Sequence, residues 1–521
     1  MSTSTPDTVS AKRGSFTSRK VFILAAIGSA VGLGNIWRFP YVAYENGGGA
    51  FLIPYLVALL TAGIPFLLLD YAIGHRHRGS APLSFARLSR GAESLGWWQV
   101  GICFLIAVYY AAVIAWAVRY TIFSVDKAWG PEPEAYFFNE VLEIGDVGVQ
   151  ANLVPGVIWP LVLVWLVVGV VLYLGVQKGI GATALVFIPL LVLAFLALVV
   201  QALFLDGAGQ GLDALFRPDW GALLDPLVWA AAFGQIFFSL SIGFGIMITY
   251  ASYVGRKTDM TGSGLVVGFA NSGFELLAGI GVFAALGFMA QAQGVAVDGV
   301  VSDGIGLAFI AFPTIINEAP LGAVLGLLFF GSLVIAGLTS LISVIEVVIS
   351  GVRDKLDLDR RAATLVVVVP ATLLSLAFFS TTSGLYVLDI VDYFVNRFGI
   401  LLVAVVSMVV VAWVLRALPM LSDHLNTHGS VPVVGWWKLL IGLVAPIALA
   451  LVLGREFYVA VTEPYGGYPA WMLGLFGWGP VAALVFMVAG FWLGHVRWRP
   501  DDVLTEYDGA RSADDEEEVP R

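Results

Sequence analysis

The chain has 521 residues and a formal net charge of −10, with 59% hydrophobic and only 12% charged residues. An ordinary soluble domain has about 25% charged residues, so a soluble fold of this composition would leave much of its surface apolar. The composition therefore excludes a soluble enzyme and a disordered chain, and the negative charge argues against nucleic acid as a partner. A polytopic membrane protein, with the lipid bilayer as its surroundings, remains.

A membrane-spanning helix needs about 20 mostly apolar residues. The sequence predicts twelve such helices and therefore an all-α polytopic membrane protein. The predicted spans are 18–43, 48–74, 97–125, 156–175, 180–205, 226–253, 262–292, 321–350, 362–380, 384–416, 436–461 and 470–496. A polar segment, 1–17, precedes them, and an acidic tail, 500–521, follows them.

Lysine and arginine concentrate in alternate connections, which is the pattern that sets the orientation of membrane proteins. Basic residues precede the first span and occupy 75–96, 254–261 and 351–361, whereas 126–155 is mostly acidic. We therefore expect a multi-pass protein of the cell membrane with both termini in the cytoplasm, as an even number of spans requires. The connection 293–320 lacks basic residues and is expected to form short helices over the outer face rather than a floppy loop.

Two predicted spans contain glycine-rich interruptions. The first span carries Gly28, Gly32 and Gly34, and the sixth carries the sequence SIGFG at 241–245. These are matching positions if 18–205 and 226–416 are two inverted five-helix repeats, with 436–496 forming two further spans. Interrupted helices at matching positions of inverted repeats indicate a binding site near the membrane midplane. The alternative is that glycine only lets neighbouring helices pack closely.

Several segments carry a family resemblance. The most specific is GSAVGLGNIWRFP at 28–40, followed by ENGGGAF at 45–51. Others are the tyrosine pair at 109–110, QIFFSLS at 235–241, TYASY at 249–253 and AGLTS at 336–340. The chain resembles the prokaryotic amino-acid transporter branch of the neurotransmitter:sodium symporter family over spans one to ten. The resemblance implies sodium-coupled secondary active symport by alternating access, whereas the last two spans match in position only.

The resemblance implies about two sodium ions, each bound by oxygen ligands, which this hard cation prefers. One set consists of the Gly28, Val31 and Ala336 carbonyls with the Thr339 and Ser340 hydroxyls. The other consists of the Ala30 carbonyl with the side chains of Asn35, Ser239 and Asn271. Alternatively, the hydroxyls bond back to their own helix and the amides only link helices.

The residue at position 32 indicates the substrate class. Monoamine-transporting relatives carry Asp there, and Gly32 offers no carboxylate, so the substrate is expected to bring its own. The resemblance assigns that carboxylate to backbone N–H groups at a helix N-terminus and to a tyrosine hydroxyl. The implied substrate-binding residues are Ser29, Ala30, Leu33, Gly34, Ile106, Tyr110, Phe238, Ser239, Ser241, Phe244, Ser340 and Val344. None is charged, which favours a neutral apolar or aromatic amino acid.

The resemblance also implies two gates. Arg38 and Asp392 would form the outer ion pair above the Phe238 ring. The inner gate would contain Arg13, Asp354, Ser252 and Tyr253, with Phe16 where the family usually has Trp. Charged groups at membrane depth are costly and usually paired, although Arg13 is also explained as a cytoplasmic charge signal. Arg397 has no family role, and we expect it to pair with a carbonyl or a carboxylate.

Glu275 is the most informative single residue. It lies four residues after Asn271 and so on the same face of a helix. Chloride-dependent relatives carry Ser there, and Glu275 would supply the negative charge itself, surrounded by Tyr55, Gln235 and Ser239. This predicts chloride-independent transport, and protonation of Glu275 after sodium leaves predicts proton counter-transport. The alternative is a static structural carboxylate.

Three other function classes compete with a transporter. A non-transporting amino-acid sensor on the same scaffold is the runner-up, but both gates and both sodium sets are present in the sequence. A channel needs a continuous pore, which two gates argue against. An enzyme is least favoured, because no nucleophile–base pair, metal cluster or phosphate loop occurs and no organic cofactor is implied. His75 and His77 fall in a basic loop, and His424 and His428 are expected as solvated loop residues.

Overall fold

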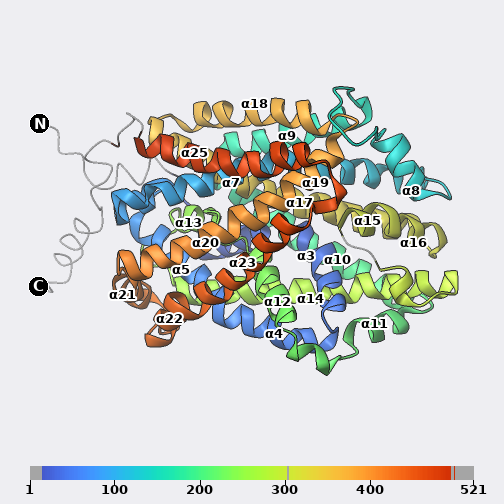
Figure 1. Cartoon of the computed structure of the whole chain (residues 1–521), viewed down its shortest axis with the longest axis horizontal. Coiled ribbons are helices and arrows are strands. Elements are labelled where there is room, and N and C mark those ends of the chain that lie inside the picture. Colours follow the sequence, from blue (N-terminus) through green and yellow to red (C-terminus); the bar gives the residue numbers. More distant parts are fainter. Residues whose placement is uncertain (1–13, 302–303, 494–497, 499–521) are drawn as a thin grey trace, which may run out of the picture.

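The structure is a computed structural model that describes residues 14–301, 304–493 and 498. Within these residues all regular structure is helical, and the extended pairings are two isolated bridges, Gly48–Pro218 and Leu153–Thr381. Figure 1 shows most long helices running roughly along one direction. The all-α prediction is therefore confirmed for the described part of the chain.

The first half of the chain contributes ten α-helices. They are α2 (Arg19–Ala30), α3 (Leu33–Glu45), α4 (Leu52–Ala58), α5 (Ile64–His77), α6 (Ala81–Leu88), α7 (Glu93–Phe123), α8 (Pro133–Tyr136), α9 (Pro155–Gly175), α10 (Ala182–Leu203) and α11 (Ala208–Phe216) among the described residues. Single 3-10 turns form η1 (Gly49–Phe51), η3 (Arg90–Ala92) and η6 (Trp220–Leu224).

The second half continues the same architecture. Its described helices are α12 (Pro226–Ser239), α13 (Ile246–Ala251), α14 (Met260–Gln293), α15 (Gly304–Gly306), α16 (Phe312–Glu318), α17 (Gly322–Leu356), α18 (Arg360–Phe379), α19 (Gly384–Phe394), α20 (Leu401–Val409), α21 (Leu418–His428), α22 (Gly435–Leu439), α23 (Ala445–Thr462), α24 (Ala470–Met472) and α25 (Gly479–Leu493). Further 3-10 turns are η7 (Val297–Gly299) and η12 (Tyr465–Gly467).

Many of these helices contain one widened, π-helical turn, in which the hydrogen bonds run from residue i to i+5. The described π-helical turns are η2 (Leu59–Gly63), η4 (Phe137–Val141), η5 (Val176–Gly181), η8 (Leu307–Ala311), η9 (Val395–Ile400), η10 (Val410–Val414), η11 (Leu440–Val444) and η13 (Leu473–Trp478). Such turns add a residue without ending the helix and often lie at functional sites.

Eight helical stretches of the described chain are long and apolar enough to cross a membrane. A ninth results if α2 and α3, which are bent by 55° at their junction, count as one broken span. One stretch, Pro155–Leu203, contains two of the predicted spans, and Pro226–Ser239 falls in the shorter apolar class. These findings support a multi-pass membrane protein, while twelve spans, the inverted repeat and the orientation stay predictions.

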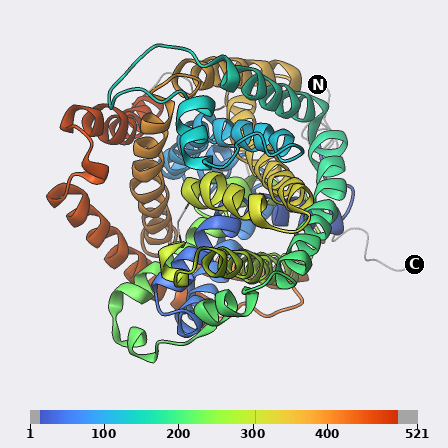
Figure 2. The same ribbon diagram turned by 90° about the vertical axis from the view of Figure 1, so that its right-hand side faces the viewer.

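Two long helices of the bundle interior, α7 and α17, make their most extensive contacts with each other. Outer helices instead expose large apolar side chains, including Leu166, Leu193, Leu373 and Leu451. Figure 2 shows α9 and α10 in teal at one edge of the bundle and the red C-terminal helices at the opposite edge. An apolar outer surface of this kind is what hydrocarbon surroundings require.

The connection 293–320 contains the short helices that the sequence predicts. α15, η8 and α16 follow one another, and Phe309 and Phe312 are completely buried. The Phe312 ring stacks on Phe329 of α17 with centroids 3.6 Å apart. The described part of this connection is therefore an ordered, packed segment.

Candidate functional site

Two helices are broken near the centre of the bundle. α2 ends at Ala30 and α3 begins at Leu33, and the Asn35 Oδ1 atom accepts a 2.9 Å hydrogen bond from the Gly32 N–H. This bond satisfies a backbone donor that the break leaves without a helical partner. The predicted interruption of the first span is therefore present.

The second break separates α12 from α13 between Ser239 and Ile246. Gly243 and Gly245 adopt φ values of +84° and +83°, which glycine tolerates at little cost. Ser241 also has a positive φ of +52°, which is uncommon for residues other than glycine. Its hydroxyl donates a 2.8 Å hydrogen bond to the Ser29 carbonyl, so the two breaks are joined directly.

A cavity of about 640 Å³ lies against both breaks. Its wall contains every residue predicted from the sequence to bind substrate: Ser29, Ala30, Leu33, Gly34, Ile106, Tyr110, Phe238, Ser239, Ser241, Phe244, Ser340 and Val344. The Tyr110 hydroxyl accepts a 3.4 Å hydrogen bond from the Leu33 N–H at the start of α3. The structure therefore gathers the predicted residues around one space, although substrate binding itself stays a prediction.

Three of the predicted sodium ligands form one buried hydrogen-bonded chain. The Asn35 amide donates to the Asn271 side-chain oxygen at 2.8 Å, and the Asn271 amide donates to the Ser239 hydroxyl at 3.1 Å. All three side chains are at most 2% exposed. Ala30 is the last residue of α2. The structure thus brings the three predicted side-chain ligands together from α3, α12 and α14.

The second predicted sodium set lies where α17 passes the end of α2. The Ser340 hydroxyl is 3.2 Å from the Ser29 carbonyl and 3.5 Å from that of Gly28. Thr339 donates to carbonyls of its own helix, Ile335 at 3.1 Å and Ala336 at 3.0 Å. Val31 follows directly as the extended residue that ends α2. Thr339 therefore shows the bonding back to the helix that was the alternative interpretation.

Glu275 is completely buried in α14, one turn after Asn271. Its carboxylate accepts a hydrogen bond from the Tyr55 hydroxyl and a 2.7 Å bond from the Gln235 amide. The predicted neighbours Tyr55 and Gln235 therefore do contact this carboxylate. An acidic group with two donors thus lies next to the chain of amides that includes Asn35.

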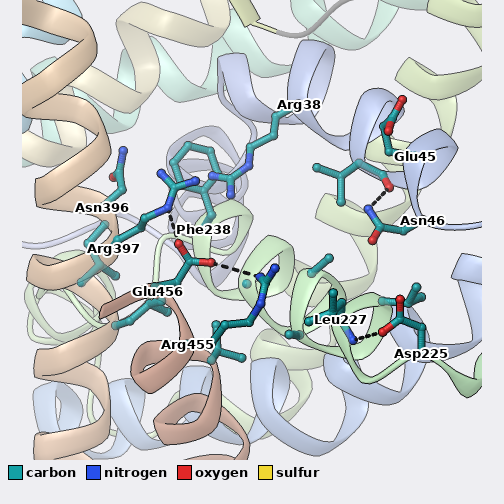
Figure 3. Close-up of a pocket in the computed structure, with 18 of the residues that line it drawn as sticks. Arg38, Glu45, Asn46, Asp225, Leu227, Phe238, Asn396, Arg397, Arg455 and Glu456 are labelled. Atoms are coloured by element: carbon teal, nitrogen blue, oxygen red, sulfur yellow. Dashed lines mark hydrogen bonds and ion pairs between the residues drawn. The ribbon is translucent and has the colours of Figure 1, made fainter. Parts of the chain in front are cut away.

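Arg38, Tyr109, Asp392 and Asn396, which we call the Asp392 cluster, line one end of the cavity. The Arg38 guanidinium lies 4.4 Å from the centre of the Phe238 ring, and Figure 3 shows it directed toward that ring. Asp392 accepts 2.7 Å hydrogen bonds from the Tyr109 hydroxyl and the Asn396 amide. The predicted outer-gate residues and the Phe238 ring therefore face the same space.

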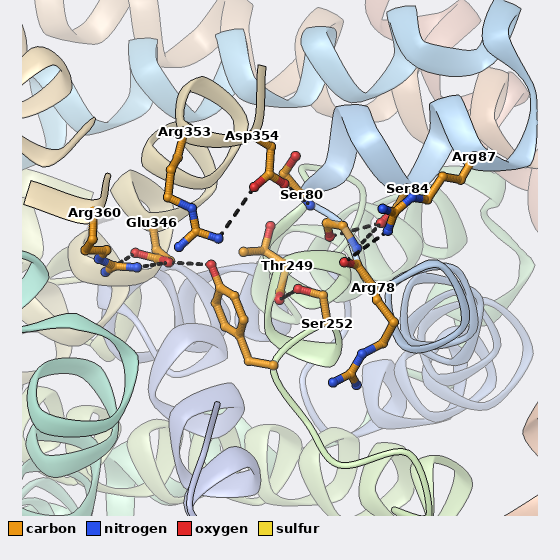
Figure 4. Close-up of polar contacts among 12 residues, drawn as sticks. Arg78, Ser80, Ser84, Arg87, Thr249, Ser252, Glu346, Arg353, Asp354 and Arg360 are labelled. Atoms are coloured by element: carbon orange, nitrogen blue, oxygen red, sulfur yellow. Dashed lines mark hydrogen bonds and ion pairs between the residues drawn. The ribbon is translucent and has the colours of Figure 1, made fainter. Parts of the chain in front are cut away.

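The predicted inner-gate residues lie in a buried polar group (Figure 4). Asp354 accepts a 2.9 Å hydrogen bond from the Ser80 N–H, and the Ser252 hydroxyl donates to the Thr249 carbonyl at 2.6 Å. Phe16 packs against Tyr253, with ring centroids 6.2 Å apart. Arg13 lies outside the described residues.

The residue at the centre of this group, Glu346, was not predicted from the sequence. Glu346 is completely buried, accepts a 2.6 Å hydrogen bond from the Tyr253 hydroxyl, and binds Arg360 through two bonds of 2.7 and 2.6 Å. We call Tyr253, Glu346, Arg353, Asp354 and Arg360 the Glu346 cluster. A lone Glu in a long apolar span was the available signal, because a buried charge needs a partner.

Three further sequence interpretations are resolved by the structure. Arg397 pairs with a carboxylate, donating through its Nε atom to Glu456 at 2.7 Å. The placement of His75 and His77 in a loop is wrong, because both lie in the last turn of α5 and are 5% exposed. The interpretation of His424 as a solvated loop residue is also wrong. It lies on α21 with its Nε2 atom 2.9 Å from the Nδ1 atom of His75, which is itself 5% exposed. Burial of the two rings between α5 and α21 explains the difference, since a sequence does not show which loops pack against which helices.

The fold and the cavity at two broken helices define a class of polytopic transport proteins, and comparison with known proteins agrees. The model of the sodium:neurotransmitter symporter family matches residues 13–131 and 130–497. A sodium-dependent transporter of Methanocaldococcus jannaschii is 42% identical over 460 residues, covering 88% of this chain and 93% of the relative. The human sodium- and chloride-dependent GABA transporter 2 is 32% identical, covering 78% and 74%. The bovine sodium-dependent dopamine transporter is 31% identical, covering 91% and 74%.

The chain belongs to the sodium:neurotransmitter symporter family. Membership makes it a sodium-dependent transporter by family rather than an enzyme, and implies that it uses sodium.

Proposed function

We propose that the protein is a sodium-coupled secondary active symporter that imports a neutral apolar or aromatic amino acid by alternating access. The observation that carries this proposal is the cavity at the two helix breaks. It combines the N-terminus of α3, where backbone N–H groups favour an anion, with the twelve predicted substrate-binding residues, none of which is charged. The charged residues of the wall, Arg38, Asp389, Asp392 and Arg397, belong to the predicted outer gate or lie beside it. A zwitterionic substrate with an apolar side chain fits that combination.

Position 32 supports the amino-acid class. A Cβ atom added to Gly32 would lie 3.0 Å from the Ser340 hydroxyl and 3.4 Å from the Tyr110 hydroxyl. Gly32 therefore leaves space beside two hydroxyls and the α3 N-terminus. A substrate carboxylate placed there would be close to Ser340, a member of the predicted sodium set that also contains Gly28, Val31, Ala336 and Thr339. It would complete the oxygen shell of that ion.

Glu275 supports chloride independence. A completely buried carboxylate, held by Tyr55 and Gln235 beside the Asn35–Asn271–Ser239 chain, supplies the negative charge that two sodium ions require. Loss of both ions would leave that charge without compensation, so proton uptake on the return step follows. The GABA transporter relative is named for chloride as well as sodium dependence, and we propose that this chain differs from it at Glu275.

Alternating access is supported by the difference between the two predicted gates. The Asp392 cluster lines the cavity, whereas the Glu346 cluster is buried. We assign the Asp392 cluster to the outer side and the Glu346 cluster to the cytoplasmic side. This orientation follows the distribution of basic residues in the connections and places both termini in the cytoplasm.

The test is uptake into proteoliposomes. Radiolabelled neutral amino acids are offered under an inward sodium gradient with gluconate in place of chloride. We expect sodium-dependent accumulation that is lost in Asn35→Ala and retained in Asn46→Ala, an asparagine at the end of α3 that bonds only to a nearby carbonyl in the described contacts. A pH dye in the lumen is expected to report proton efflux that Glu275→Gln abolishes.

The alternative is a non-transporting amino-acid sensor on the same scaffold. Saturable, sodium-dependent binding without accumulation in the same vesicles would favour the sensor. Uptake that needs chloride would leave the symporter standing and contradict the role of Glu275.

A further inference from the structure

Arg397 occupies an unusual place beside the predicted outer gate. It lies in the π-helical turn η9, five residues after Asp392. In an ordinary α-helix, residues five apart face different directions, but a turn with i to i+5 hydrogen bonds brings them toward the same side. Asp392 and Arg397 accordingly line the same two cavities, the 640 Å³ cavity and a neighbouring one of about 430 Å³.

Two arginines share these cavity walls with one gate carboxylate, because Arg38, Asp392 and Arg397 line both cavities. A single carboxylate cannot make its strongest, two-point contact with both guanidinium groups at once. If the gate closes by pairing Arg38 with Asp392, a second arginine within reach is a competitor.

The structure shows what holds Arg397 back. Its Nε atom donates to the Glu456 carboxylate of α23 at 2.7 Å, and its guanidinium lies 3.9 Å from the centre of the Tyr393 ring. Figure 3 shows the Arg397 side chain directed to Glu456, with Arg455 on the other side of that carboxylate. The Glu456 contact directs the guanidinium to α23, and the Tyr393 contact holds it against a ring of α19.

The Arg397–Glu456 pair contributes little to holding the helices together. The two side chains are 35% and 20% exposed, and partly exposed ion pairs add little stability. Other contacts already join the chain after α23 to α19. The Tyr465 and Tyr468 hydroxyls donate to Asp389 at 2.8 and 2.9 Å, and Tyr465 stacks on Tyr393 with centroids 3.7 Å apart.

We propose that Glu456 is a positioning residue of the outer gate: it holds Arg397 away from Asp392, so that Asp392 stays available to Arg38. This proposal rests on the proposed transport function for its kinetic readout. Through Glu456, α23 contributes to the outer gate, although this helix matches the family in position only. Replacing Glu456 frees Arg397 to compete with Arg38 for Asp392, whereas replacing Arg397 removes that competition.

The test compares Glu456→Gln, Arg397→Gln and the double variant. We expect Glu456→Gln to raise the KM for amino-acid uptake about tenfold with kcat little changed, because a weakened gate lets substrate escape. Arg397→Gln and the double variant should stay within about threefold of the wild type. Arg455→Gln is the matched control, since Arg455 is 3.7 Å from Glu456 and 47% exposed, and it should change KM less than about twofold.

The order of these effects separates positioning from simple tethering. A tether predicts equal losses in both single variants and the double variant, and that result would overturn the proposal. So would a Glu456→Gln variant that behaves like Arg455→Gln. Recovery in the double variant is the expected result, because it restores the gate without restoring the ion pair.

A second readout does not depend on transport. In a Cys103→Ala background with Ile106→Cys in the cavity wall, a charged thiol reagent reports access to the cavity. We expect labelling several-fold faster when Glu456→Gln is added and near the reference rate in the double variant. If the wild type transports no amino acid, the proposed function fails while this comparison still decides the role of Glu456. Equal labelling rates in all variants would overturn the proposal.

Discussion

The Glu346 cluster and the Asp392 cluster use the same kinds of residue in different surroundings. At the Glu346 cluster, Glu346 is completely buried and bound by both Arg360 and Tyr253. In the Asp392 cluster, Arg38 and Asp392 face open volume, and the neighbouring Arg397 and Glu456 are partly exposed. A buried charge that loses its partner costs far more than an exposed one. Separating the charged groups of the Glu346 cluster should therefore cost more free energy than rearranging those of the Asp392 cluster.

The largest expected effect comes from breaking the buried pair. Glu346→Ala leaves the Arg360 guanidinium without its carboxylate and should destabilise the protein by about 3–5 kcal/mol. Thermal unfolding in detergent measures this loss. The control is Arg217→Gln, which removes an exposed i, i+4 pair with Asp213 and should cost less than about 1 kcal/mol. Equal losses would show that burial does not make the Glu346–Arg360 pair more important for stability than an exposed pair.

A change at the centre of the cavity should alter substrate class. Gly32→Asp places a carboxylate against the Ser340 and Tyr110 hydroxyls, where a substrate carboxylate is expected. We expect amino-acid uptake to fall at least about 100-fold, because like charges would repel. Gly32→Ala controls for size and should lose less. Amino-acid uptake that survives in Gly32→Asp would contradict the assigned carboxylate position.

The Phe238 ring beside the Asp392 cluster can be displaced without changing a charge. A Cβ atom at Gly34 would overlap the Phe238 ring, so Gly34→Ala must displace the ring that lies beneath Arg38. We expect substrate affinity to fall about tenfold, with thermal stability little changed. Gly234→Ala is the matched control, because a Cβ there meets nothing within 4 Å. Similar affinities of the two variants would mean that Phe238 does not cover the substrate.

A second effect on stability, smaller than that of Glu346→Ala, concerns acid. Burial lowers the pKa of His424 to about 3, and the nearby charges of His75, Arg76, His77 and His428 add to this. The unfolded chain protonates this residue near pH 6.5. Stability should therefore fall as the pH drops from about 6.5 toward 3, by up to about 2 kcal/mol at pH 5.

Thermal unfolding at pH 7 and pH 5 measures this difference in stability. His424→Gln should reduce the pH dependence, while His428→Gln, at an exposed position on the same helix, should leave it unchanged. A pH dependence that is identical in the wild type and His424→Gln would exclude His424 as its source.

Local features of the fold were predictable from the sequence, and distant pairings were not. Glycines at 28–34 and 241–245 indicated the two breaks, because glycine tolerates backbone that other residues avoid. The apolar stretch 305–316 indicated short packed helices. The partners of Glu346 and Arg397 lie 14 and 59 residues away, on other elements. Their charge required some partner, but only the packing of helices decides which one.

The same limit applies to His424 and to the number of spans. The residues of a connection that pack against a helix end cannot be read from local hydropathy. Broken helices such as α12 and α13 also fall below the length that defines a span. The predicted site residues were found together because the family resemblance, not periodicity, placed them.

The widened turn η9 has one more consequence. A π-helical turn inserts one extra residue into an α-helix, so the residues after it are rotated relative to the positions that an unbroken α-helix would give them. Arg397 lies inside this turn and Asp392 lies just before it. The direction of the Arg397 side chain relative to Asp392 therefore depends on a single inserted residue of the backbone.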